Sequence, residues 1–255
     1  LYKVSSEGGD AQQLTFHEAH DYQAVWSKDG KQIAFASNRY GNFDVYVMSA
    51  NGGAARRLTY NSSDEQPFTF THDDKKILFG AVRMDEVNHR QFPTESQPEV
   101  YNVPVAGGRV DQVFTIPAEF LNISKDGNTI LYHDKKGGEN IWRKHHQSSI
   151  TRDIWNYDVA TDTHKMITSF KGEDRMPVFS SDQNSFYYLS EQSGSFNLHK
   201  SNLDGSNTNQ LTSFKLHPVR FLSFGNGTLC FGFDGKLYTL KEGQEPKKLE
   251  VHITT

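Results

Sequence analysis

The chain has 255 residues, with 27 basic and 31 acidic residues and a formal net charge of −4 at pH 7. This near balance offers no basic surface for nucleic acid, and no apolar run reaches the roughly 20 residues that a membrane-spanning helix needs. Hydrophobic residues make up 35 % and aromatic residues 13 % of the chain, which favours thin, half-exposed sheets over a thick helical core. A single cysteine, Cys230, excludes an internal disulfide.

One short motif that ends in threonine recurs along the chain, and its copies are spaced by 44, 56, 53 and 44 residues. The copies lie at 13–15, 57–59, 113–115, 166–168 and 210–212. An aspartate turn precedes the later copies, at Asp29, Asp73, Asp126 and Asp182. A repeat of this length indicates an architecture in which each unit buries its apolar face against its neighbours. The recurrence of aspartate at one turn position predicts that its side chain caps nearby backbone amides.

The clearest repeat, 20–59, reads as four short strands separated by turns such as Asp29-Gly30 and Gly52-Gly53. Asp-Gly and Gly-Gly pairs between short β-branched or aromatic runs are hairpin signals. Four strands in about 44 residues are typical of a propeller blade. The sequence therefore predicts an all-β protein, a six-bladed β-propeller of four-stranded antiparallel blades, as a single domain over residues 1–255.

The first blade of this propeller is expected to be only partly present. The expected blades are 1–19 (partial), 20–59, 60–115, 116–168, 169–212 and 213–255. Residues 1–19 contain only the two outer strands of a blade, and half a blade leaves backbone edges unpaired. We therefore expect its two inner strands to lie upstream of Leu1, in a longer parent chain or in a piece lost from this one.

Two blades carry insertions of roughly ten residues, near 83–99 and 135–151. Loops on a rigid scaffold often carry binding residues, whereas the alternative reading is a tolerated surface insertion. His145 and His146 are adjacent, so their side chains point to opposite faces of an extended chain and cannot both bind one metal ion. The binding candidates in these insertions are Arg90, Trp142, Arg143, His145 and His146.

A second set of binding candidates precedes the innermost strand of each blade. These strands line the central channel of a propeller, so we expect the residues just before them to meet at one channel mouth. Carboxylates together with a few basic residues could bind peptide termini or a cation. The alternative is that these residues form a solvated rim of salt bridges, which contribute little to stability. The channel-mouth candidates are Asp21, Asp64, Glu65, Glu119, Glu173, Asp174, Arg175, His217 and Arg220.

Motifs for catalysis or metal binding are not evident in the sequence. The Gly-x-Ser-x-Gly motif of a nucleophile elbow does not occur, and Ser193-Gly194-Ser195 reads as a turn. The segment His17–His20 is one residue short of the zinc motif His-Glu-x-x-His. The sequence therefore predicts no catalytic residue, no metal ion and no cofactor.

The run from Trp26 to Met48 resembles the TolB-type propeller repeat, which is clearest in 20–59 and 169–212. The insertion of the third complete blade, with two stretches downstream of it, resembles the N-terminal propeller of bacterial tricorn-type serine peptidases more specifically. The stretches that carry this resemblance are 137–140, 143–146, 152–155 and 172–175. The resemblance implies a non-catalytic propeller beside a PDZ-like and a protease domain. These domains would lie beyond Thr255, so no catalytic residue is transferred to this chain.

The resemblance further implies a module that binds or gates peptide or unfolded-protein substrates for such a peptidase, in the periplasm or elsewhere outside the cytoplasm. The expected partners are a peptide, an unfolded protein or another protein, together with further domains of the same parent chain. An alternative is a stand-alone TolB-like periplasmic scaffold that binds proteins and serves no protease. A propeller enzyme with its active residues in the channel is the third and weakest hypothesis, because no acid–base or nucleophile pair stands out.

Overall fold

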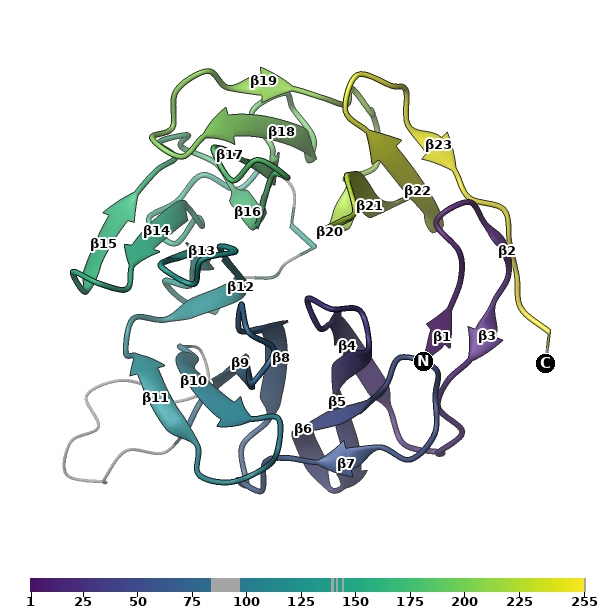
Figure 1. The fold of residues 1–255 in the computed structure, drawn as a ribbon. Helices are drawn as coiled ribbons and strands as arrows, with labels where there is room; N and C mark the ends of the chain where they lie inside the picture. Colours follow the sequence, from purple (N-terminus) through teal and green to yellow (C-terminus); the bar gives the residue numbers. More distant parts are fainter. Residues whose placement is uncertain (84–96, 139, 141, 144, 255) are drawn as a thin grey trace. The chain divides into compact units, whose positions relative to one another are not determined.

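The computed structural model describes residues 1–83, 97–138, 140, 142–143 and 145–254 (Figure 1). None of the described residues is helical, so the described chain offers no helix that could cross a membrane. The contacts divide the chain into two compact units. Unit 1 comprises Leu1–Lys3 and Gln12–Ile123, and unit 2 comprises Val4–Ala11 and Ser124–Thr255.

Unit 1 consists of short antiparallel strands joined by turns (Figure 1). Two of them, β1 (Tyr2–Lys3) and β3 (Gln12–Gln13), form a two-stranded sheet. The next four are β4 (Asp21–Trp26), β5 (Gln32–Tyr40), β6 (Asn42–Ser49) and β7 (Arg56–Arg57). They are followed by β8 (Glu65–Phe70), β9 (Lys76–Ala81), β10 (Glu99–Pro104), β11 (Asp111–Phe114) and β12 (Ala118–Ile123).

Unit 2 repeats the same pattern of short strands. Its first strands are β13 (Thr129–Asp134), β14 (Ile154–Asp158) and β15 (Thr163–Met166). Two sets of four follow, β16 (Asp174–Phe179), β17 (Ser185–Ser190), β18 (Asn197–Asn202), β19 (Asn209–Gln210), and β20 (Arg220–Gly225), β21 (Thr228–Phe233), β22 (Lys236–Lys241), β23 (Lys247–Lys248). In addition, β2 (Gly9–Asp10) pairs in parallel with β24 (Val251–His252).

The described strands form five four-stranded sheets in chain order, β4–β7, β8–β11, β12–β15, β16–β19 and β20–β23. We call them blades 1 to 5. The predicted all-β propeller of four-stranded antiparallel blades is confirmed, but the prediction of six blades is wrong, because the described chain has five. The segment 1–15 supplies only the last two strands of the pattern: Leu14 N donates to Leu1 O (2.9 Å), just as Leu58 N donates to Val45 O (2.8 Å).

Apolar side chains pack between successive blades. In unit 1, Phe70, Ile77 and Phe79 of blade 2 are fully buried in one cluster with apolar residues of blade 1. In unit 2, Leu198 of blade 4 and Phe231 of blade 5 belong to a corresponding cluster. Each strand alternates its side chains between the two faces of its sheet, so every blade in the interior of a unit contributes to two such layers.

The recurrent aspartates cap turns, as predicted. Each one accepts a hydrogen bond from the backbone N–H two residues further on, at 2.9–3.2 Å. A hydroxyl four positions before that donor also binds the carboxylate, as Ser27 Oγ binds Asp29 Oδ1 at 2.7 Å. The residues are Asp29, Asp73, Asp126 and Asp182. This side-chain pattern fixes the turn between the first and second strands of a blade.

In blades 1, 3 and 4 the recurrent threonine caps the third strand of its blade. The hydroxyls of Thr59, Thr168 and Thr212 each accept a hydrogen bond at 2.9 Å, from the backbone N–H of Val45, Ile154 and Leu198 respectively. These three apolar residues are fully buried, so their N–H groups need a partner inside the protein. The fourth strands β7 and β19 are only two residues long, and the hydroxyl replaces the ladder partner that they do not supply.

The same threonine also reaches the next blade. The hydroxyls of Thr15, Thr59 and Thr168 interact with the carboxyl group that begins the first strand of the following blade. Those carboxyl groups belong to Asp21, Glu65 and Asp174. The threonine motif therefore ties one blade to the start of the next.

We expect Thr59→Val to lower the free energy of unfolding by about 1–3 kcal/mol, because it leaves the buried N–H of Val45 without an acceptor. Thr163→Val, at an exposed position of β15, is the control and should change this free energy by less than about 0.5 kcal/mol. Denaturation in urea, followed by tryptophan fluorescence, measures both. Equal effects of the two substitutions would show that the Thr59 cap contributes no more to the free energy of unfolding than an exposed threonine.

Candidate functional site

The nine channel-mouth candidates fall in both units, and we describe each unit by itself. Unit 1 holds Asp21, Asp64, Glu65 and Glu119, and unit 2 holds Glu173, Asp174, Arg175, His217 and Arg220. Of the candidates in the insertions, Trp142, Arg143, His145 and His146 also belong to unit 2. Arg90 lies outside the described residues.

In unit 1, two of the candidate carboxylates are engaged inside their own blades. Asp21 lies 3.0 Å from Arg39 and Glu65 lies 2.8 Å from Arg83, and both acidic side chains are buried. Each arginine also lies over two aromatic rings of its blade. Asp64 is exposed, and its carboxylate accepts a hydrogen bond from Phe43 N (2.9 Å). Asp21 therefore stabilises blade 1 from within, and Glu65 does the same for blade 2.

In unit 2, a buried group of charges surrounds Glu173, whose side chain is fully buried. Its Oε2 accepts a hydrogen bond from Arg175 Nε (2.8 Å), and its Oε1 lies 3.4 Å from Arg152 NH1 and 3.7 Å from His146 Nδ1. Burial raises the pKa of Glu173, but the hydrogen bond from Arg175 and the charges of Arg175 and Arg152 outweigh it, so the pKa is lowered. We call these four residues the Glu173 cluster.

The insertion between β13 and β14 is anchored to this cluster. His146, which is 5 % exposed, brings the loop to Glu173, and His145 N donates to Glu191 Oε1 (3.2 Å). Near the start of the insertion, the Lys136 ammonium binds Asp153 Oδ2 (2.5 Å) and Thr151 O (2.7 Å). The two histidines thus make different contacts, and the described part of the loop is held to its own unit.

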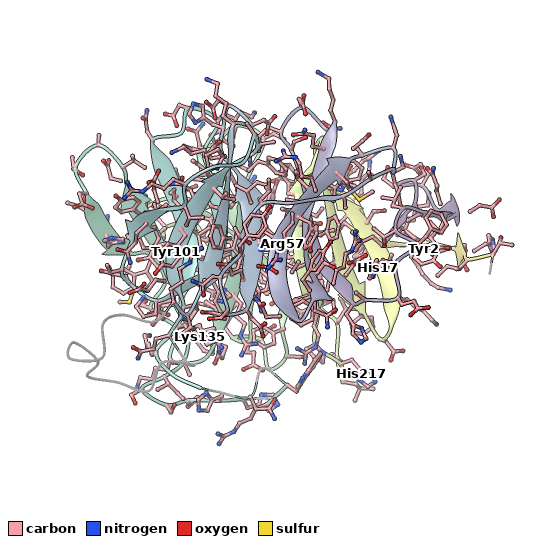
Figure 2. All side chains as sticks on the ribbon, turned by 90° about the horizontal axis from the view of Figure 1, so that it is seen from below. Tyr2, His17, Arg57, Tyr101, Lys135 and His217 are labelled. Carbon is pink, nitrogen blue, oxygen red and sulfur yellow. The ribbon has the colours of Figure 1, made fainter. Side chains whose placement is uncertain are left out.

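Exposed apolar side chains gather at the end of unit 2 where β16 and β20 begin, which we call the entry end. The Arg220 guanidinium lies 4.3 Å from the ring centroid of Trp142, and Trp142 is 59 % exposed. Phe221 and Leu216 are more exposed still. The His217 side chain stands out from the ribbon (Figure 2). We call these five residues the Trp142 patch.

Two of these exposed residues have a left-handed backbone. Phe221 has a φ of 58° and Leu216 a φ of 73°, a left-handed conformation that costs free energy for residues with a Cβ. At Phe221 the pairing of β20 with β21 also shifts register, which is the signature of a β-bulge. Blades 1 and 4 have the same shift with a left-handed residue, Gln23 and Met176, so the bulge is a repeated feature of the first strand, and Phe221 differs from them in being exposed.

Asp174 lies beside the Glu173 cluster and is 1 % exposed. Burial, helped by the negative charges of Asp153 and Glu173, raises the pKa of its carboxyl to about 7 against the opposing hydrogen bonds of Ser190 and Thr168. Its Oδ1 has no hydrogen-bond partner among the described residues. Asp174 is therefore a buried acid that changes its charge near neutral pH.

The internal repeat explains this pKa. Residues 21–59 align with 174–212 without a gap, and the alignment places Asp174 at the position of Asp21 and Gln192 at the position of Arg39. Burial raises the pKa of Asp21, but hydrogen bonds from Ser37, Arg39 and Thr15 lower it overall. Blade 4 keeps the acid and lacks the arginine, so burial dominates at Asp174.

Sequence reasoning missed several residues of this end of unit 2. Arg152 and Glu191 were not among the candidates because they are buried by tertiary contacts, which a strand pattern does not reveal. Leu216 and Phe221 were missed because nothing in the sequence shows a positive φ at a non-glycine residue. The gap-free alignment of blades 1 and 4 is the one signal that would have marked Gln192.

The stability of unit 2 should depend on the protonation of Asp174. Its pKa is raised in the folded state, so its contribution is full below about pH 4 and is lost as the pH rises to about 7. Over this window we expect the wild type to lose about 3 kcal/mol of unfolding free energy relative to Asp174→Asn. Gln192→Arg should restore stability above pH 7, because a guanidinium lowers the pKa of the neighbouring acid. Urea denaturation from pH 4 to 9 measures both; parallel curves for wild type and Asp174→Asn would contradict the assignment.

Comparison with solved structures finds the same fold in two TolB proteins. A putative TolB from Agrobacterium tumefaciens has a TM-score of 0.71 and 16 % identity, and the match covers 91 % of this chain and 81 % of that one. TolB from Acinetobacter baumannii has a TM-score of 0.71 and 17 % identity, with 94 % of this chain and 56 % of that one covered. At such identities the likeness shows the fold alone.

The tricorn protease is also similar, with a TM-score of 0.53 and 14 % identity. The match covers 91 % of this chain but only 26 % of the protease. A search of curated protein sequences finds no significant match. A family model described as the tricorn protease N-terminal beta propeller domain matches residues 1–246, and the chain therefore belongs to the family of tricorn protease N-terminal β-propeller domains.

Proposed function

We propose that this chain is a non-catalytic module that binds peptide or unfolded-protein substrates and gates their access to a tricorn-type serine peptidase. In this proposal the protease domain lies outside residues 1–255. Membership of the tricorn N-terminal propeller family supports the proposal. The observation that carries it is the Trp142 patch, where Trp142 and Arg220 stack at the entry end of unit 2.

The chemistry of the patch suits an extended chain of varied sequence. Tryptophan and arginine are enriched among the residues that dominate binding energy at protein interfaces. An indole and a guanidinium together contact apolar side chains, aromatic rings and peptide carbonyls, none of which requires a particular sequence. Phe221 and Leu216 extend the apolar surface beside them.

The buried charges beneath the patch support its rigidity. The Glu173 cluster and the His145–Glu191 hydrogen bond anchor the insertion that carries Trp142. A side chain that is already held in its bound conformation loses less entropy on binding. We therefore assign Glu173, Arg175 and His146 a positioning role, and Trp142, His217 and Arg220 the contacts with the peptide.

The alternative is a stand-alone TolB-like scaffold that binds a protein partner. The higher TM-score of the two TolB structures, 0.71 against 0.53 for the tricorn protease, favours it. Under this alternative the same patch would bind a folded surface rather than an extended chain. For both functions we propose an extracytoplasmic location, on the strength of the family resemblance alone.

Substitution of Trp142 and Phe221 by alanine in one variant should weaken the binding of a fluorescein-labelled, unfolded casein fragment by roughly tenfold or more, because the variant removes both aromatic anchors. Phe16→Ala, at a residue of unit 1 that is 80 % exposed, is the matched control and should leave the affinity unchanged. Fluorescence anisotropy measures the affinities.

Two results would count against the proposed function. If the double variant is folded and binds the fragment as tightly as the control, the patch is not the peptide site. If the isolated chain hydrolyses casein, the non-catalytic role is wrong. A folded protein partner that binds through the patch while the casein fragment does not would favour the TolB-like scaffold.

A further inference from the structure

A cavity of about 400 Å³ opens at the opposite end of unit 2, between blades 4 and 5. It lies where β16 turns into β17 and β20 turns into β21. The turn 180–182 and the turn Asn226-Gly227 line the cavity, and Tyr187, Phe224 and Lys241 also contribute to its wall. Neither the fold nor the proposed function assigns it a role.

Unit 1 shows what the corresponding turn of blade 1 binds. The carboxylate of Asp74 accepts two hydrogen bonds from that turn, Oδ1 from Lys28 N (2.6 Å) and Oδ2 from Asp29 N (2.9 Å). Asp74 belongs to the turn of blade 2 and has a φ of 57°. Two successive backbone N–H groups of one blade thus hold both oxygens of a carboxylate that the next blade supplies.

A second example lies between blades 3 and 4. Lys125 N, in the turn of blade 3, donates to Gln183 Oε1 in the turn of blade 4 (2.9 Å). Gln183 has a φ of 61° and occupies the same left-handed turn position as Asp74. The turn of the earlier blade therefore presents backbone donors, and an oxygen from the later blade accepts from them.

Between blades 4 and 5 the donors remain but the acceptor is missing. The gap-free alignment of blades 1 and 4 places Ser181 and Asp182 at the positions of Lys28 and Asp29. The turn of blade 5 is shorter: two residues separate the paired Gly225 and Thr228, whereas six separate the paired Phe179 and Phe186. No side chain of blade 5, all of which is described, accepts a hydrogen bond from Ser181 or Asp182.

We propose that this cavity binds a carboxylate ligand on the backbone N–H groups of Ser181 and Asp182, in the way that Asp74 binds in unit 1. The tilted ring pair of Tyr187 and Phe224, with centroids 5.3 Å apart, offers an apolar wall beside the carboxylate. Lys241 adds a positive charge at the rim. The ligand class is a carboxylate next to an apolar group, from the C-terminus of a peptide or from an acidic side chain.

The acidic side chain of Asp182 does not prevent this binding. Its carboxylate is taken by Ser180 Oγ (2.6 Å) and Asn184 N (3.1 Å). Asp29 has the same two contacts, with Ser27 Oγ and Lys31 N, and the Asp74 carboxylate nevertheless binds beside it. The other acid of the cavity, Glu242, is paired with Lys200 (2.5 Å) and accepts from Tyr187 Oη (2.9 Å).

The test compares an acid with its amide on the unaltered chain. We expect N-acetylphenylalanine to shift the amide resonances of Ser181 and Asp182 in a saturable way in ¹⁵N-labelled protein. N-acetylphenylalanine amide should bind at least roughly tenfold more weakly, because it lacks the charged acceptor. The α-amide of N-acetylaspartic acid, which carries only a side-chain carboxylate, distinguishes an acidic side chain from a peptide C-terminus as the source.

A matched pair of variants tests the donor itself. Ser181 is the second residue of a turn closed by the Gln183 N to Ser180 O hydrogen bond (3.2 Å), a position that proline favours. Ser181→Pro removes the N–H group and should weaken N-acetylphenylalanine at least roughly tenfold, whereas Ser181→Ala keeps the donor and should bind like the wild type.

Equal binding of the acid and the amide, an absence of binding, or equal binding by the two Ser181 variants would overturn the proposal. If Ser181→Pro does not fold, the comparison of N-acetylphenylalanine with its amide still decides whether the cavity binds a carboxylate. The Trp142 patch lies at the other end of unit 2, so the double alanine variant there should bind N-acetylphenylalanine normally. This separates a failure of the carboxylate site from a failure of the proposed function.

Discussion

Blades 1, 3 and 4 depend on one buried hydroxyl, that of the recurrent threonine. Thr59, Thr168 and Thr212 accept from a buried backbone N–H that the short fourth strand leaves without a ladder partner. The chain crosses to the next blade just after this threonine, so the cap also sets where the next first strand begins. The carboxylates at the start of these first strands therefore have a structural role, as the ion pairs of Asp21 and Glu65 show.

The aspartate turn recurs in blades 1 to 4 and the capping threonine in blades 1, 3 and 4, because these blades solve the same backbone problem, and both signals led to the correct blade type. The number of blades was wrong because the segment 1–19 was counted as part of a sixth blade whose two inner strands were expected upstream of Leu1, whereas the described strands form five four-stranded sheets. The motif in 1–19 marks the outer strands of a blade but does not supply the inner strands that would complete it.

The candidate site was predicted less well, because its character comes from contacts between segments that are distant in sequence. Glu173, Arg175 and Arg220 were named for their place before a first strand, and unit 2 does bring them to its entry end. Whether a carboxylate is exposed or buried there depends on Arg152 and His146, which reach Glu173 from an insertion. The sequence distance between these groups carries no information about their burial or pKa.

Departures from the repeat mark the positions where this protein differs from a plain scaffold. Blade 4 keeps the acid of blade 1 but replaces Arg39 with Gln192, and the result is a carboxyl that titrates near neutral pH. Blade 5 shortens the turn that supplies an acceptor in blades 2 and 4, and the result is a cavity beside two backbone donors. Blade 3 carries the insertion that presents Trp142. None of these departures repeats a contact that the other blades use to hold the fold together, so they are the positions at which the proposed functions can be tested apart from the scaffold.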